Sequence, residues 1–198
     1  MPDSFLGDGL VYEELLPIAW SSGPLMEGLA LARLNADNQQ LLGAVSSLDE
    51  VRVAEGLKEE SPALLSELQR LEFKINILLR LTAEIAMRNS GMPEAEKVRL
   101  SSHALEWFGE RTPKVGATGL LSVYINPALP QPVKIPSKVE GERVVDGAHV
   151  AQMRFVGLGE AVIEQLEKLI FRRHRRLIAG AKGAPVDLDS TLRPTRIR

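Results

Sequence analysis

The chain has 198 residues, of which 44% are hydrophobic and 25% charged, and its formal net charge is −2. This composition is typical of a soluble globular protein, and the charge supplies no overall positive field to attract nucleic acid or acidic lipid. The sequence contains no cysteine, which excludes disulfides, thiol nucleophiles and cysteine metal sites and fits a reducing, cytoplasmic location.

The N-terminal part of the chain is predicted to begin with a strand. No basic flank precedes an apolar run there, and no stretch reaches the roughly 18 uncharged apolar residues of a membrane span, so we expect neither a signal peptide nor membrane insertion. Residues 9–20 favour a strand, whose pairing should end at Pro17 because proline has no N–H to donate.

A first helix is predicted from residue 25 to about residue 55, after a Ser-Ser-Gly-Pro break. Its leucines and valine recur at intervals of three and four, with Asn38 at the missing position of the stripe. An asparagine at such a position can fix the register of packed helices at some cost in stability. The alternative is that Asn38 is an ordinary surface residue.

A second, longer helix is predicted over residues 61–92. Ser61 can cap its first amides, Pro62 suits the first turn, Gly91 allows a left-handed exit, and Pro93 prevents continuation. Its apolar residues form a heptad seam, with Thr82 filling the one gap: Leu64, Leu68, Leu71, Ile75, Leu78 and Ile85.

Two interpretations of this seam differ in what covers it. One is a core helix packed within a monomer, and the other is an oligomerisation helix that packs against copies of itself. The seam runs through about four heptads and is widened by Leu65, Leu79 and Leu81, which favours the oligomer.

After Pro93 the periodicity changes from helix to strand. Alternating residues predict strands over 97–108, 118–126, 133–139 and 149–156, separated by turn residues. Pro136 lies inside the third of these and suggests an edge strand or a bulge. Short strands at this spacing are typical of a small antiparallel barrel or sandwich, which the N-terminal strand could complete across the helical insertion.

A third helix is predicted over residues 159–180, followed by a flexible tail over 181–198. The helix ends in a basic run, Arg172-Arg173-His174-Arg175-Arg176. These cations either satisfy the dipole at a solvated helix end or contact phosphate. No aromatic residue is interleaved with them, so a stacking platform for single-stranded nucleic acid is missing and nucleic acid is not the expected partner.

The sequence contains no recognisable catalytic or metal-binding motif. The three histidines are far apart, and HExxH, GxSxG and Walker lysine patterns are missing. Residues 157–162 resemble the start of a dinucleotide loop, but the third glycine is missing, so these glycines are better explained as a strand-to-helix turn. We therefore expect no enzyme, no metal and no bound cofactor.

The order of the motifs resembles the atypical PilZ domains, in particular their tetramer-forming branch. The matching segments are LQRLEFKINILL at 68–79, VRLSSHALEW at 98–107, INPALPQPVKIPSKV at 125–139, MRFVGLGE at 153–160 and FRRHRR at 171–176. The resemblance implies an α+β fold in which a small antiparallel β-barrel with a C-terminal helix occupies residues 95–180. An inserted helical oligomerisation region would occupy residues 25–92. It also implies a homotetramer and a place in bacterial cyclic di-GMP signalling.

The ligand motifs of that family are incomplete in this chain. A nucleotide-binding PilZ domain carries RxxxR before the barrel and [D/N]xSxxG on an early strand. The second motif would fall on residues 99–104, where Ser101 matches, Arg99 replaces the acid and Ala104 replaces the glycine. No RxxxR lies between residues 93 and 99. Arg99 and Ser101 are thus the candidate residues of a degenerate site, and cyclic di-GMP is not the favoured ligand.

Three functional hypotheses follow. The favoured one is an oligomeric adaptor that binds an unidentified protein in a cyclic di-GMP pathway. The second is a receptor that binds the nucleotide through a nonstandard site, with Arg99, Ser101 and the C-terminal arginines. The third is a nucleic-acid binder that uses residues 172–176.

Overall fold

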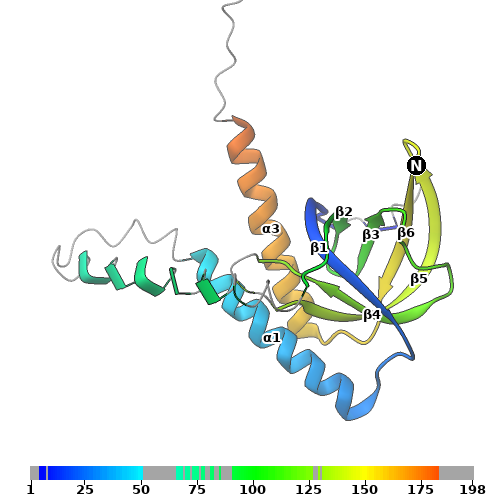
Figure 1. The fold of residues 1–198 in the computed structure, drawn as a ribbon, viewed down its shortest axis with the longest axis horizontal. Helices are drawn as coiled ribbons and strands as arrows, with labels where there is room; N and C mark the ends of the chain where they lie inside the picture. The colour runs from blue at the N-terminus through cyan, green and yellow to red at the C-terminus, as the bar shows by residue number, and fades with distance from the viewer. Residues whose placement is uncertain are drawn as a thin grey trace, which may run out of the picture.

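The computed structural model describes residues 5–7, 9–50, 91–126, 129 and 131–182, together with residues 66–68, 70, 71, 73–75, 77, 78, 81, 82 and 85. Along the chain, the elements are β1 (Tyr12–Ser22), α1 (Gly28–Glu50), β2 (Ala95–Leu100), β3 (Ala104–Phe108), β4 (Thr118–Val123), β5 (Val133–Val145), β6 (Ala148–Phe155) and α3 (Glu160–Lys182) (Figure 1).

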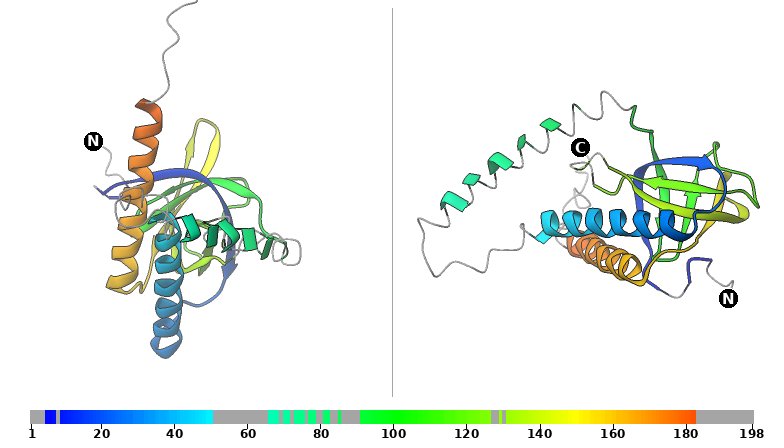
Figure 2. Two further views of the ribbon diagram at one scale, coloured as in Figure 1. Left: turned by 90° about the vertical axis from the view of Figure 1, so that its left-hand side faces the viewer. Right: turned by 90° about the horizontal axis from the view of Figure 1, so that it is seen from below.

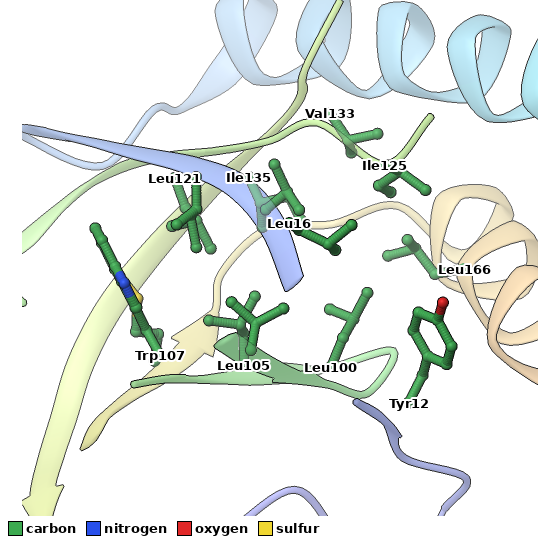
Figure 3. Close-up of a cluster of buried hydrophobic side chains, with 14 of the residues drawn as sticks. Tyr12, Leu16, Leu100, Leu105, Trp107, Leu121, Ile125, Val133, Ile135 and Leu166 are labelled. Atoms are coloured by element: carbon green, nitrogen blue, oxygen red, sulfur yellow. The ribbon is translucent and has the colours of Figure 1, made fainter. Parts of the chain in front are cut away.

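The six strands form a closed antiparallel barrel in the order β1-β2-β3-β6-β5-β4, in which β4 pairs back with β1. The predicted α+β class is therefore confirmed, and the sheet is a barrel rather than a sandwich. Side chains from alternate positions of the strands point inward and form the core (Figure 3). Leu166 of α3 packs against this core from one end of the barrel.

Strand β1 closes the barrel by changing its partner at Pro17. It pairs with β2 from Tyr12 to Pro17 and with β4 from Ile18 to Ser22. As predicted, the pairing of β1 with β2 ends at Pro17. The strand itself does not end there, because β1 continues through the proline and pairs with β4. Pro17 therefore lacks an N–H at the position where β1 changes its partner strand. Its carbonyl accepts a hydrogen bond from the Tyr124 N–H at 3.0 Å.

The strand predicted over 97–108 is in fact two strands, β2 and β3, joined by a tight turn at 101–103. The Ser101 N–H donates to the Ala104 carbonyl at 2.9 Å and closes this turn. The alternation of apolar residues continues on both sides of the turn, so the turn leaves little trace in the hydrophobic pattern.

Strand β5 is longer than predicted and contains Pro136, which pairs with Leu120 of β4. Because the barrel is closed, Pro136 does not mark an edge strand, and the bulge that it suggested lies farther along, between Val139 and Gly141. The hairpin to β6 turns at Asp146 and Gly147, both with positive φ, as a tight two-residue turn requires.

Helix α1 lies beside α3 and against β5 (Figure 2). Its residues Leu34, Leu42 and Val45 are buried. Asn38 is also buried, and its Nδ2 donates to the Lys134 carbonyl at 2.7 Å, while its Oδ1 accepts from the Lys134 N–H at 3.0 Å. It is therefore neither a register residue between copies nor a surface residue, because it satisfies the backbone of β5.

A second asparagine of α1 fixes the turn between β6 and α3. Asn35 donates to the Gly157 carbonyl at 2.9 Å and accepts from the Gly159 N–H at 3.1 Å. Gly157 has a positive φ of 72°, and a Cβ on it would lie 2.7 Å from Leu31. The glycines of the MRFVGLGE segment thus turn the chain from strand to helix, as the sequence predicted.

The described residues between 66 and 85 are helical, and we call them the arm. The arm extends away from the barrel (Figures 1 and 2). Its described seam residues are between 48% and 62% exposed in the single chain: Leu68, Leu71, Ile75, Leu78 and Ile85. The Thr82 hydroxyl donates to the Leu78 carbonyl at 2.9 Å, so its polarity is satisfied within the helix.

Several predictions for the insertion and the tail lie outside the described residues: the Ser61 cap, Pro62, Leu64 and most of the tail at 181–198. Gly91 is described, and its φ of 57° confirms the left-handed exit. Within the described part of the chain, no helix is long and apolar enough to span a membrane.

Candidate functional site

The turn between β2 and β3 is where the degenerate motif falls, and Ser101 holds it together. The Ser101 side chain is buried, its Oγ accepts from the Ala104 N–H at 3.1 Å, and its hydroxyl can donate to the Ala104 carbonyl at 3.2 Å. The hydroxyl is therefore committed to the turn. Ala104, where the motif has glycine, is fully buried.

Arg99 lies on the outer face of β2, since its neighbours Val98 and Leu100 point into the core. Its Nη1 donates to Glu106 Oε2 at 2.9 Å, and its Nε lies 3.9 Å from Glu13 Oε2. The structure thus directs Arg99 along the barrel wall toward two carboxylates and does not bring it together with Ser101.

Glu106 organises a polar cluster on that wall. Its carboxylate is only 2% exposed and accepts from Arg99, from Arg143 Nη2 at 2.9 Å and from Gln152 Nε2 at 3.1 Å. The strand register places Arg99, Glu106 and Gln152 directly opposite one another on β2, β3 and β6. The sequence analysis missed Glu106, although an acid within the apolar run ALEWF was a signal that it needs buried partners.

A pocket of about 740 Å³ lies beside the turn, between N-terminal residues 6–10, β6 and α3, and we call it the turn pocket. Ser101 lines it, whereas Arg99 is not among its lining residues. Its walls are largely apolar: Leu6, Leu10, Phe155, Ile170 and Phe171.

The polar groups of the turn pocket come from the turn and from α3. The Ser102 Oγ lies 2.7 Å from His103 Nδ1 and donates to Glu167 Oε1 at 3.2 Å. Lys168 and Arg154 complete the polar lining. Among the described residues, no group of three or more histidine, aspartate or glutamate side chains could hold a metal ion.

The segment before the barrel also lacks the arginines that the resemblance would require. No RxxxR lies between residues 93 and 99, around the start of β2, and residues 1–11 precede β1 in this sequence. This N-terminal segment contains neither arginine nor lysine.

The basic run on α3 is partly structural. Arg173 donates to Glu14 Oε2 at 2.7 Å and to the Ile125 carbonyl, and Arg172 donates to the Ser46 hydroxyl on α1. Neither alternative from the sequence, a solvated helix end or a phosphate patch, describes these two side chains. They hold α3 against the barrel and α1.

Tyr12 lies beside this ion pair, with the Arg173 guanidinium 5.4 Å from its ring. Burial, and after it the hydrogen bond and charge of Glu14, raise the pKa of Tyr12 to about 12, and the Arg173 charge opposes this shift. Because the unfolded tyrosine ionises near pH 10, its contribution to stability is complete below about pH 10 and is lost as the pH rises toward 12.

We expect an alkaline absorbance titration to show a tyrosine component near pH 12 that is missing in Tyr12→Phe. Between about pH 10 and pH 12, Tyr12 stays neutral in the folded chain, whereas a tyrosine in the unfolded chain ionises. If the native protein ionises completely with a midpoint near pH 10, the proposed environment of Tyr12 is wrong.

Comparison with known proteins gives one family and a related fold. The sequence model described as an atypical PilZ domain, cyclic di-GMP receptor, matches residues 42–183. A search of curated proteins found no match.

The solved structures that match this one include two PilZ proteins. A Xanthomonas campestris protein, described as a tetrameric PilZ domain self-assembled through an unusual helical bundle, is similar with a TM-score of 0.67 and 23% identity over 87% of this chain and 91% of that one. The PilZ domain of YcgR from Escherichia coli, solved with cyclic di-GMP, has a TM-score of 0.35 and 17% identity over 46% of this chain and 82% of that one.

Proposed function

Because the chain belongs to the atypical PilZ domain family of cyclic di-GMP receptor domains, we propose that it acts in cyclic di-GMP signalling as a non-enzymatic adaptor. In this proposal the chain assembles through the arm and binds another protein. It does not clamp the nucleotide between two arginines, because the sequence motifs at the turn are degenerate.

The observation that carries the adaptor proposal is the state of the arginines near the turn. Arg99 is bound to Glu106 and Glu13, and residues 1–11 contain neither arginine nor lysine. A phosphate clamp needs guanidinium groups that point at the ligand with their donors available. Freeing Arg99 for this role would leave the Glu106 carboxylate with one fewer partner.

The energies involved favour weak nucleotide binding. A dissociation constant of 1 μM requires about −8 kcal/mol, and charged hydrogen bonds contribute roughly 1.5–3 kcal/mol each. The loss of a two-arginine clamp removes several of these bonds. The buried Ala104 methyl group also occupies space that a glycine would leave open to a closely approaching ligand.

Calorimetric titration with cyclic di-GMP tests the proposal. We expect no saturable heat at low-micromolar protein and nucleotide, at low or moderate salt. Saturable binding with a dissociation constant below about 5 μM, abolished by Arg99→Ala and unchanged in the exposed-arginine control Arg111→Ala, would establish a receptor instead.

The receptor function remains a second candidate because the turn pocket borders the turn that carries the degenerate motif and is lined by Ser101. A nucleotide bound there would have to use Ser102, His103, Arg154 or Lys168 in place of the usual arginines. The same titration with Lys168→Ala tests this site.

We propose self-association through the arm, as a homotetramer, with the seam at Leu64, Leu68, Leu71, Ile75, Leu78 and Ile85. The described seam residues are exposed in the single chain, and exposed apolar stripes of this length mark interaction sites. Leu81 beside the seam is also exposed, which widens the stripe beyond the narrow seam of a two-stranded coiled coil. A tetramer built on a helical bundle is the assembly described for the Xanthomonas protein.

A further inference from the structure

The turn pocket has the features of a docking site for an apolar side chain. Its volume of about 740 Å³ is within the range of small-ligand pockets, and its walls are mainly leucine, isoleucine and phenylalanine side chains. At its rim, Leu10 is 44% exposed and Phe171 is 49% exposed. A bulky apolar side chain placed there would remove both rim residues from water.

Two cations with weak or uncharged partners lie at the pocket: Lys168 lines it, and Arg175 lies beside the rim residue Phe171. Lys168 pairs with Glu164 at 2.7 Å across one turn of α3, but both side chains are 63% exposed, and such exposed pairs contribute little to stability. The Arg175 guanidinium lies 5.8 Å from the Phe171 ring centroid and has no ion pair with a described carboxylate. Both cations can accept a new carboxylate without leaving a buried acid unpaired.

Besides the cations, one carboxylate, Glu167, lines the pocket. Glu167 accepts the Ser102 hydroxyl, and Glu140 pairs with Arg154 at 3.2 Å. The Arg154 guanidinium also lies 4.4 Å from the Phe5 ring centroid. The pocket lining therefore holds two cations, Arg154 and Lys168, and one carboxylate beside an apolar hollow, which complements a ligand that is apolar at one point and acidic next to it.

We propose that the turn pocket binds a short segment of a partner protein in which a bulky apolar residue enters the pocket and a neighbouring acidic residue pairs with Lys168 or Arg175. This inference rests on the proposed adaptor function and assigns its docking surface and the chemistry of its partner. The apolar anchor supplies most of the affinity, and the carboxylate sets orientation and accelerates association.

Fluorescence anisotropy with labelled synthetic peptides tests this assignment. The probes carry one central leucine, phenylalanine or tryptophan between aspartates, and the matched controls replace either the central residue by alanine or the aspartates by lysines. We expect saturable binding of the acidic apolar peptides to the full chain and at least tenfold weaker binding of both controls. Binding should weaken with added salt.

Two protein variants locate the binding. Phe171→Glu should weaken binding at least tenfold, and Lys168→Glu should weaken it for acidic peptides alone. Leu29→Glu, an exposed leucine of α1 that does not line the pocket, should leave binding unchanged. Thermal unfolding shows whether each variant is folded. If Phe171→Glu does not fold, Leu10→Glu takes its place as the rim variant.

Three results would overturn the proposal. The first is the lack of saturable binding by any acidic apolar peptide, and the second is equal loss in Phe171→Glu and Leu29→Glu. The third is binding that appears only after Leu188 and Leu192 are replaced by aspartate, which would assign the pocket to this chain's own C-terminal segment. If neither the peptides nor cyclic di-GMP bind, only the proposed docking site is contradicted. If cyclic di-GMP binds saturably, the adaptor function itself is contradicted.

Discussion

Replacing both Leu71 and Leu78 with glutamate is expected to dissociate the assembled protein into monomers. Each substitution places a carboxylate at a seam position that is exposed in the single chain and covered in the proposed bundle. Buried like charges without partners cost several kcal/mol, and every 1.4 kcal/mol weakens association about tenfold. Light scattering coupled to size-exclusion chromatography measures the change in mass.

The matched control for the arm is again Leu29→Glu, which introduces the same charge at an exposed leucine outside the seam and should leave the mass unchanged. A wild-type protein that is monomeric at micromolar concentration contradicts the proposed assembly. So does a double variant that keeps the wild-type mass.

The second large effect is expected at Glu106. Glu106→Gln keeps the shape of the side chain but removes the charge that binds Arg99 and Arg143. Since charged hydrogen bonds contribute about 1.5–3 kcal/mol and both arginines remain partly exposed, we expect the free energy of unfolding to fall by about 2–3 kcal/mol. The midpoint of thermal unfolding should fall by roughly 5–10 °C for a chain of this size.

Glu142→Gln is the control for this cluster, because Glu142 pairs with His149 at 2.8 Å on the exposed part of the β5–β6 hairpin. Exposed pairs contribute little, so its unfolding midpoint should match that of the wild type within about 1–2 °C. Equal midpoints for the two variants would show that the buried cluster does not stabilise the barrel.

Local sequence patterns were sufficient to predict most of the barrel. Leu121, Val123 and Ile125 alternate and are all buried, and Val133, Ile135 and Val139 behave in the same way. Such alternation depends on which face of a strand is buried, and this is a local property. The exposed arm also followed from its heptad spacing, although what covers it stays a prediction.

Features that depend on distant partners could not be read from the sequence. Asn38 was assigned to a helical seam or to the surface, yet its partners are the N–H and carbonyl of Lys134, far along the chain. Likewise, Pro17 reads as a strand end until the exchange of β2 for β4 is known. In both cases the decisive contact joins segments on opposite sides of the insertion.

The candidate site was predicted only in part. The position of Arg99 on the outer face of β2 followed from the alternation with Val98 and Leu100. The sequence did not show that Glu106 and Glu13 engage this arginine, because cross-strand pairing sets that contact. The turn pocket was missed entirely, since residues 6–10 and α3 meet only in the folded chain.

The exchange of partners by β1 has a consequence for how the chain reaches its native state. β1 is the first strand to be synthesised, but its neighbours β2 and β4 begin only at Ala95 and Thr118, after the whole insertion. Loop closure over a long insertion adds little free energy, about 0.6 kcal/mol for each doubling of length, but non-local pairing slows folding. Barrel closure is therefore expected to be the late step: during translation β1 has no partner strand until β2 emerges from the ribosome, and its second half has none until β4 emerges.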